Sequence, residues 1–274
     1  MKIGFIGYGN MASAMVQGMI KSQRYAAEDI TVTARNYEGL KTKAEKLKIN
    51  FSTDNIQVAS QSDILFLSVK PYLYKQIIEE IRDYVNVATV IVTVAAGIST
   101  RDVAELFGRE VKVVRTIPNT PALVNQAMTL YFPNDLVSDE ETRTVRRILE
   151  SFGRAELIGE KQFDGPGSMT GCSPAFIFML MEAMADAAVL EGLERKKAYL
   201  LAAQTVKGAA EMLLTSGLHP GELKDMVTSP GGTTIEGVRK LEELGFRSAM
   251  IEAIEAAANK TRSLSRKPKP EEGK

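Results

Sequence analysis

The stretch Lys2-Ile3-Gly4-Phe5-Ile6-Gly7-Tyr8-Gly9-Asn10-Met11-Ala12 decides the fold of this chain of 274 residues. Its first six residues are a short apolar run typical of a strand, and a helical pattern begins at Asn10. Gly7, Gly9 and Ala12 match G-x-G-x-x-G/A at the junction, where the glycines permit a tight turn and close approach of a pyrophosphate. The N-terminus of the helix offers unpaired N–H groups to the same anion. We therefore predict a dinucleotide-binding turn made of Ile6, Gly7, Tyr8, Gly9, Asn10 and Met11.

Short apolar strands alternate with amphipathic helices through the first half of the chain. Runs such as ILFLSV (64–69) and TVIVTV (89–94) are continuously apolar or β-branched, as expected when helices cover both faces of a parallel sheet. We predict an α/β, Rossmann-type doubly wound sheet over residues 1–162. Its expected strands are Lys2–Gly7, Ile30–Ala34, Ile64–Ser68, Thr89–Val94 and Val111–Ile117, and a later strand–helix–strand unit, Ala127–Phe132, Asp139–Phe152 and Glu156–Ile158, extends it. The expected helices between the first strands are Asn10–Lys21, Glu38–Leu47, Asn55–Gln61, Leu73–Tyr84 and Thr100–Phe107.

Strand-like runs disappear after about Phe163, and residues 163–274 are predicted to form an all-helical domain. Its apolar run Pro174–Leu193 is interrupted by acidic residues, so we expect a buried helix and no membrane span. Residues 265–274, SRKPKPEEGK, are charged and rich in proline, which favours a flexible tail. The expected helices are Pro174–Gly192, Lys196–Ser216, Pro220–Met226, Thr233–Leu244 and Phe246–Leu264.

Composition narrows the class of protein. Hydrophobic residues make up 45% and charged residues 25%, and the formal net charge is +0, which argues against a nucleic-acid partner. The single cysteine, Cys172, allows no intramolecular disulfide, and the opening residues lack the pattern of a signal peptide. We therefore expect a cytoplasmic, globular protein.

The end of the second predicted strand bears on the choice of dinucleotide. An NAD site usually has an acid there to bond the ribose 2′-hydroxyl, but this strand ends at Ala34 and is followed by Arg35 and Asn36. A guanidinium can bond a 2′-phosphate through a fork of donors, and the alternative is that Arg35 is a solvated loop residue. We favour NADPH as the cofactor and leave NADH open.

Three further loops follow predicted strands at their carboxyl ends, where ligands collect in open α/β sheets. Ordinary strand-to-helix turns would look the same, so each loop is a hypothesis. The candidate cofactor-binding residues in them are Ser68, Val69, Lys70 and Pro71, then Ala95, Ala96 and Gly97, and then Asn119.

Ser229-Pro230-Gly231-Gly232-Thr233-Thr234 leads into a predicted helix and forms a second candidate anion site. The alternative is a Ser/Thr cap with a glycine turn. A loop at Thr170–Pro174, with Ser173 as the N-cap of the following helix, is read as structural, and Cys172 as a small packing residue. The only histidine is His219, and no cluster has metal-ligand spacing, so we expect no metal and chemistry supplied by a cofactor.

Taken together, these motifs resemble the pyrroline-5-carboxylate reductase family along about residues 1–264. The most specific stretch is Leu223–Ile235, LKDMVTSPGGTTI. The other matching motifs are Phe5–Met11, Val69–Pro71, Ala95–Gly97 and Asn119–Pro121, in the same order and spacing. One departure is Cys172, where the family usually has serine.

The resemblance implies reduction of 1-pyrroline-5-carboxylate to L-proline, in proline biosynthesis, with NADPH or NADH. It also implies that the helical domain is a dimerisation domain and that homodimers can assemble into a decamer. In the family the signature loop grips the substrate carboxylate, which assigns substrate binding to Ser229, Gly231, Gly232, Thr233 and Thr234. Thr234 would hydrogen-bond the ring nitrogen as the catalytic residue, and Asn55 would help hold the 2′-phosphate.

Two alternatives remain open. A β-hydroxyacid dehydrogenase or a related imine reductase shares this two-domain plan, and Lys196, Lys197 and Lys207 could serve as the lysine that a dehydrogenase needs. A paralogue that binds NADPH as a sensor is the alternative outside enzymes.

Overall fold

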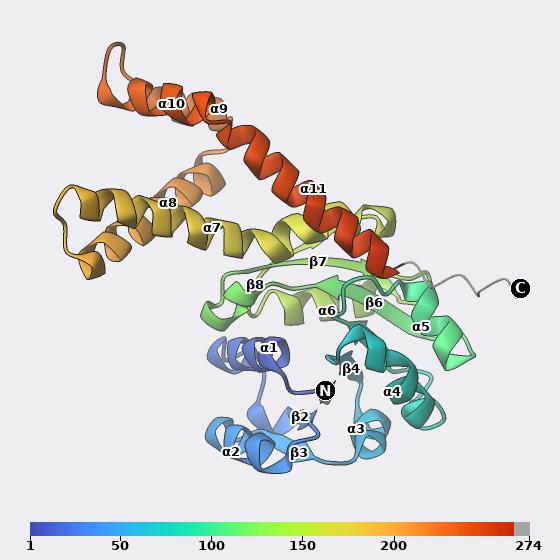
Figure 1. Cartoon of the computed structure of the whole chain (residues 1–274). Helices are drawn as coiled ribbons and strands as arrows, with labels where there is room; N and C mark the ends of the chain where they lie inside the picture. The colour runs from blue at the N-terminus through green and yellow to red at the C-terminus, as the bar shows by residue number, and fades with distance from the viewer. Residues whose placement is uncertain (266–274) are drawn as a thin grey trace, which may run out of the picture. The chain divides into compact units, whose positions relative to one another are not determined.

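The computed structural model describes residues 1–265, so all of the expected tail except Ser265 lies outside the described residues. Eight strands form one sheet in the order β3-β2-β1-β4-β5-β6-β7-β8 (Figure 1). Strands β1 to β6 are parallel, β7 runs antiparallel to β6, and β8 runs parallel to β7. The strands are β1 Ile3–Ile6, β2 Ile30–Thr33, β3 Asn50–Ser52, β4 Ile64–Leu67, β5 Val90–Thr93, β6 Lys112–Ile117, β7 Ala127–Pro133 and β8 Gly153–Leu157.

Helices cover both faces of this sheet, and the alternation of side chains along each strand explains how. Ile3 and Phe5 of β1 face a core shared with α1, α2 and α6, whereas Ile6 faces a second core shared with α3, α4 and α5. Phe5 stacks on Phe66 of β4 at 4.5 Å between ring centroids. These helices are α1 Asn10–Lys21, α2 Tyr37–Leu47, α3 Asn55–Gln61, α4 Tyr74–Ile81, α5 Thr100–Phe107 and α6 Asp139–Leu149. The predicted doubly wound fold is confirmed.

Two strands differ from the prediction. Strand β3 was not predicted, because a run of three residues at the sheet edge, Asn50–Ser52, has no hydrophobic pattern of its own. Strand β8 begins three residues before the predicted Glu156, since Gly153 pairs with Ala127 and extends the ladder. A Cβ at Gly153 would lie 2.1 Å from the Ala127 carbonyl oxygen, so this start requires glycine.

The remaining described helices are α7 Asp164–Leu190, α8 Arg195–Ser216, α9 Pro220–Met226, α10 Thr233–Glu243 and α11 Phe246–Ser265. Two compact units result, one made of residues 1–172 with residues 257–265, and one, the helical unit, made of Ser173–Ala256. The expected boundary at residues 162 and 163 precedes α7, and α7 itself continues from the first unit into the helical unit.

The interpretation of Thr170–Pro174 as a loop is wrong. Those residues lie inside α7, with Pro174 within the helix, so Ser173 is not an N-cap. Proline has no N–H for the carbonyl four residues back, that of Thr170. Asn119 replaces the missing donor, because its Nδ2 donates to the Thr170 oxygen at 3.0 Å.

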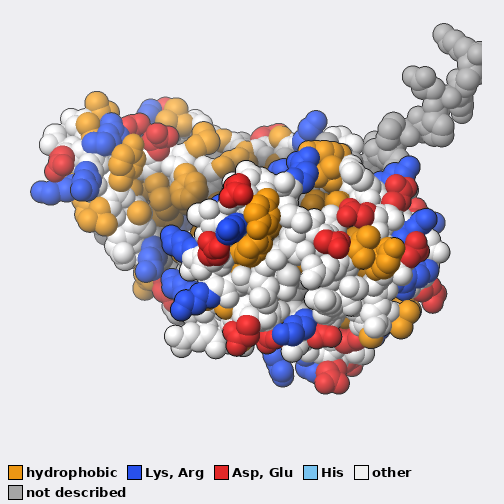
Figure 2. All heavy atoms as spheres, turned by 90° about the horizontal axis from the view of Figure 1, so that it is seen from below, with side chains coloured by type: hydrophobic (Ala, Val, Ile, Leu, Met, Phe, Trp, Pro, Cys, Tyr) orange, Lys and Arg blue, Asp and Glu red, His pale blue; other side chains and the backbone are white. Residues whose placement is uncertain are grey.

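The expectation of a buried helix at Pro174–Leu193 is also wrong for the single chain. Helix α7 is long and apolar enough to cross a membrane by length and composition, with a mean hydropathy of 1.5, but only 6% of that window is buried. Phe178, Met179 and Leu190 are more than half exposed. Helix α8 also exposes Leu200 and Leu201, and Figure 2 shows hydrophobic side chains gathered on the surface of the helical unit. Within residues 1–265, these apolar side chains stay uncovered.

Candidate functional site

The glycine turn after β1 has the geometry that a dinucleotide requires. Gly7 has φ +93°, and its N–H donates to the Thr33 carbonyl oxygen at 3.1 Å. A Cβ on Gly7 would lie 2.7 Å from the Ser68 carbonyl oxygen, so the chain itself demands glycine at this position. Gly9 differs, because its φ of −81° suits any residue and no protein atom lies within 4 Å of a Cβ built there. The space beside Gly9 is therefore open for a ligand to approach the backbone.

Helix α1 begins at this turn without a side-chain cap. Gly9 is its N-cap and provides no hydrogen-bonding side chain, so the N–H groups of the first turn, starting at Asn10, face outward. Helices α2, α3, α5 and α6 are instead capped by the side chains of Asn36, Asp54, Ser99 and Ser138. The α1 terminus keeps its donors for an anion. Ile6, Tyr8 and Met11 pack their side chains into the cores, so they can reach a nucleotide through the backbone.

The ends of β1, β4 and β5 bring the predicted loops together. Ile6 aligns with Leu67, and Leu67 aligns with Thr93, so the Gly7 turn, the Ser68–Pro71 loop and the Ala95–Gly97 loop leave the same edge of the sheet. Two side-chain oxygens at this edge, Ser68 Oγ and Thr93 Oγ1, are buried without a hydrogen-bond partner. Buried hydroxyls usually have partners, so these two donors fit a site that a polar ligand completes.

The loop residues differ in exposure. Lys70 is exposed, Val69 packs on the core, and Pro71 opens a short 3₁₀ turn ending at Leu73. In the other loop Ala95 is buried, Ala96 is exposed, and Gly97 has φ +78°.

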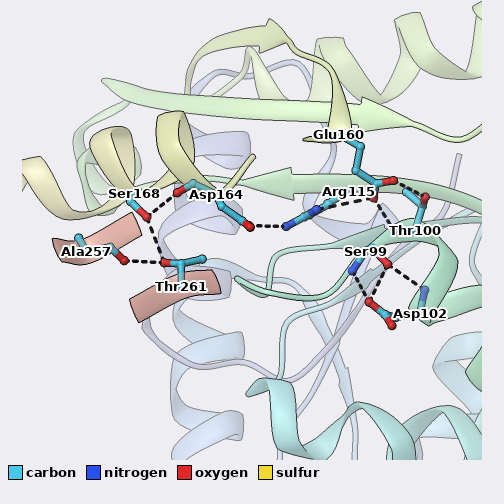
Figure 3. A network of polar contacts seen from close by, with 9 residues as sticks. All are labelled: Ser99, Thr100, Asp102, Arg115, Glu160, Asp164, Ser168, Ala257 and Thr261. Atoms are coloured by element: carbon cyan, nitrogen blue, oxygen red, sulfur yellow. Dashed lines mark hydrogen bonds and ion pairs between the residues drawn. The ribbon is translucent and has the colours of Figure 1, made fainter. Parts of the chain in front are cut away.

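A buried arginine holds the helix that follows the Ala95–Gly97 loop (Figure 3). Arg115 of β6 is 5% exposed and lies 3.7 Å from Glu160 and 3.5 Å from Asp164. Glu160 accepts from the Thr100 N–H at 2.7 Å, at the start of α5. Burial lowers the pKa of the Arg115 guanidinium, and the two carboxylates oppose that shift. Sequence analysis missed this network, since its members are far apart in the chain.

The end of β2 holds an exposed cation beside a polar chain. Arg35 is exposed, and among the described residues it has no ion pair or hydrogen bond, so its guanidinium is free for a phosphate. Thr33 Oγ1 donates to Asn55 Oδ1 at 2.7 Å, which places Asn55 of α3 beside the end of β2, and its role at the 2′-phosphate stays a prediction. The Asn36 side chain accepts from the Gly39 N–H and caps α2. Ala34 lies between Thr33 and Arg35 in the chain.

Asn119 has partners on both sides of its side chain. Its Nδ2 donates to Thr170 and its Oδ1 accepts from the Met128 N–H at 3.0 Å, and the residue is 7% exposed. The side chain therefore stabilises α7. Only the second N–H of its amide or its backbone is left to contact the cofactor. No signal in the sequence could reveal this pairing across 51 residues.

The Ser229–Thr234 loop of the helical unit repeats the features of the α1 turn. Gly231 has φ +67°, Gly232 is the N-cap of α10, and no side chain caps this helix. A Cβ on Gly232 would lie 2.3 Å from Ser229 Oγ, so a larger residue there would displace the Ser229 hydroxyl. Thr233 and Thr234 open the helix with outward N–H groups, and the arrangement suits a small anion. The predicted substrate loop thus has the local geometry of an anion site.

Other features of the described residues carry no comparable chemistry. A cavity of about 340 Å³ is lined by Arg24, Arg146, Glu150 and Gly153–Glu156, and none of the predicted site residues lines it. Within residues 1–265 no group of His, Cys, Asp and Glu could hold a metal ion. Cys172 is partly buried in α7.

Comparisons with known proteins agree on one family. Residues 160–264 match the family model for pyrroline-5-carboxylate reductase dimerisation, and residues 2–97 match one described as NADP oxidoreductase coenzyme F420-dependent. The chain is similar to pyrroline-5-carboxylate reductase of Escherichia coli (strain K12), with 45% identity over 97% of this chain and 98% of the relative.

Solved structures agree with this result. A pyrroline-5-carboxylate reductase from Coxiella burnetii has a TM-score of 0.89 and 34% identity, covering 97% of this chain and 99% of that one. A Plasmodium falciparum pyrroline carboxylate reductase with NADP bound has a TM-score of 0.88 and 30% identity, covering 97% and 98%.

Proposed function

The chain belongs to the pyrroline-5-carboxylate reductase family, and we propose that it reduces 1-pyrroline-5-carboxylate to L-proline with NADPH, the last step of proline biosynthesis. The observation that carries this proposal is the similarity to the E. coli enzyme over 97% of the chain. The uncapped, glycine-rich start of α10 gives it a structural basis, because the substrate of such an enzyme is a small carboxylate.

NADPH, when bound, supplies the hydride. The residues proposed to hold it are the Gly7–Met11 turn at the pyrophosphate, Arg35 and Asn55 at the 2′-phosphate, and the loops Ser68–Pro71 and Ala95–Gly97 nearer the nicotinamide. The unpartnered hydroxyls of Ser68 and Thr93 support a polar ligand at this edge.

The Ser229–Thr234 loop is proposed to bind the imine. The N–H groups of Gly232 and Thr233 clamp the carboxylate, and Thr234 orients the ring nitrogen. A cyclic iminium is already an electrophile, so placement supplies a large share of the barrier reduction. No strong acid is needed in the loop.

A second copy of the chain is the proposed partner of the apolar helices. The dimerisation match covers residues 160–264, the same region that exposes Phe178, Met179 and Leu200. Exposed apolar patches of this extent mark interfaces. We therefore assign the exposed face of α7 to a homodimer and not to a membrane, with a decamer as the larger assembly. The cytoplasm, where NADPH is available, is the proposed location.

The decisive experiment follows NADPH absorbance after 1-pyrroline-5-carboxylate is added. We expect the imine to oxidise NADPH. We expect no reduction of NADP when a 3-hydroxy acid is offered instead. Turnover with the hydroxy acid alone would indicate a β-hydroxyacid dehydrogenase, and NADPH binding without turnover would indicate a sensor.

The Thr234→Ala variant tests the assigned catalytic residue in the same assay. Losing one hydrogen bond to a charged group costs about 1.5–3 kcal/mol, so kcat/KM for the imine should fall roughly tenfold to a hundredfold. The dissociation constant of NADPH should change less than about twofold. Normal turnover would remove Thr234 from the mechanism.

A further inference from the structure

We propose that Glu80 of α4 sets the balance between NADPH and NADH by placing a carboxylate at the ribose 2′ position. This inference rests on the proposed function. It starts from Asn55, whose Nδ2 lies 3.2 Å from Oε1 and 3.1 Å from Oε2 of Glu80. The amide therefore already donates to an anion in the protein itself.

A continuous polar chain ties Glu80 to the dinucleotide turn. The Gly7 N–H lies 3.4 Å from Thr33 Oγ1, Thr33 Oγ1 donates to Asn55 Oδ1, and Asn55 donates to Glu80. In Rossmann sites the ribose 2′ group lies at the end of the second strand, which here is Thr33. Glu80 is thus two side-chain hydrogen bonds from that strand end.

The charge of Glu80 is not neutralised inside the protein. The residue is exposed, and no described Lys or Arg lies within ion-pair distance of it, although its neighbour Glu79 pairs with Lys75. Asp54, the acid beside Asn55 in the chain, is occupied as the N-cap of α3. Arg35 is equally unpaired, so an unpaired cation and an unpaired anion both belong to this end of β2.

These two charges have opposite effects on the two cofactors. Arg35 attracts a 2′-phosphate, which carries close to two negative charges, whereas Glu80 repels it and competes for the Asn55 amide. A 2′-hydroxyl can donate to a carboxylate, as it does to the acid at the end of β2 in NAD sites. Glu80 therefore supplies from α4 the acid that the β2 sequence lacks, and it shifts the preference toward NADH.

Equilibrium binding of NADPH and NADH without imine tests this role, because the two differ only in the 2′-phosphate. The ratio of the NADPH dissociation constant to that of NADH should fall about tenfold in Glu80→Gln, as expected for removing one charge a few ångströms away at the surface. Glutamine keeps the size of the side chain, and the thermal midpoint of the ligand-free variant checks its fold.

The matched control is Glu79→Gln, which removes the same charge one residue away on α4 without a bond to Asn55. Its ratio should change less than about twofold. An unchanged or higher ratio in Glu80→Gln, or an equal fall in Glu79→Gln, overturns the role of Glu80 and leaves the reductase activity standing. A wild-type protein that binds neither nucleotide overturns this role and the proposed function together.

Discussion

At the residue scale, Gly7 and Gly9 of the first turn are glycines for different physical reasons. Gly7 is required by the chain, because its φ of +93° and the Ser68 carbonyl oxygen exclude a side chain. Gly9 has ordinary backbone angles and open space around it, so the protein alone would accept alanine there. The G-x-G motif identified both positions. It could not show that the backbone requires the first glycine and that only a ligand would require the second.

Alanine substitutions distinguish them. Gly7→Ala should destabilise the protein by about 1–3 kcal/mol, because the new Cβ strains the backbone. Gly9→Ala should change the free energy of unfolding by less than about 0.5 kcal/mol while weakening NADPH binding roughly tenfold, since the methyl group occupies the approach of the pyrophosphate. Denaturant melts and fluorescence titration with NADPH measure the two effects. Wild-type NADPH affinity in Gly9→Ala would show that this glycine does not face the nucleotide.

At the scale of elements, a proline inside a helix depends on a side chain from another segment. Pro174 interrupts the hydrogen bonds of α7, and Asn119, from the turn after β6, bonds the carbonyl of Thr170 that this leaves free. The same amide accepts from Met128 of β7. Helix α7 therefore continues from Asp164, where the sequence predicted a loop followed by a new helix.

A double-mutant cycle tests this dependence. Asn119→Ala should lower the free energy of unfolding by about 1–3 kcal/mol, because the Thr170 carbonyl and the Met128 N–H, both partly buried, lose their hydrogen bonds. Pro174→Ala restores a backbone N–H for the Thr170 carbonyl, so in the double variant part of that loss should be recovered. Urea denaturation of the four proteins gives the coupling free energy. Strict additivity would mean that Asn119 does not compensate for the proline.

At the scale of the whole molecule, the apolar surface of the helical unit supports the proposed homodimer. Phe178 on α7 is 63% exposed, and Val87, between α4 and β5, is 78% exposed. Only Phe178 lies within the region that matches the dimerisation model. Both residues are exposed and apolar in the single chain. We expect Phe178 to be buried in the interface and Val87 to stay in solvent, so Val87 is the control position.

Light scattering on glutamate variants tests the assignment. Phe178→Glu should reduce the particle toward the mass of one chain, 30.0 kDa, because a buried charge in the interface is unfavourable. Val87→Glu should keep the wild-type mass. Met179→Glu provides a second variant at an exposed apolar position of α7. Wild-type mass in both α7 variants would exclude this helix from the interface.

The sequence by itself determined the doubly wound sheet, the helical second half and the positions of both glycine-rich turns, because these depend on local periodicity and on backbone freedom at single residues. Tertiary structure alone decided the short edge strand β3, the continuous helix α7, the Arg115 network and the pairing of Asn55 with Glu80. The physical reason is distance along the chain. A hydrogen bond between residues 25 or 51 positions apart leaves no periodic trace, and whether a helix face is covered depends on what folds against it.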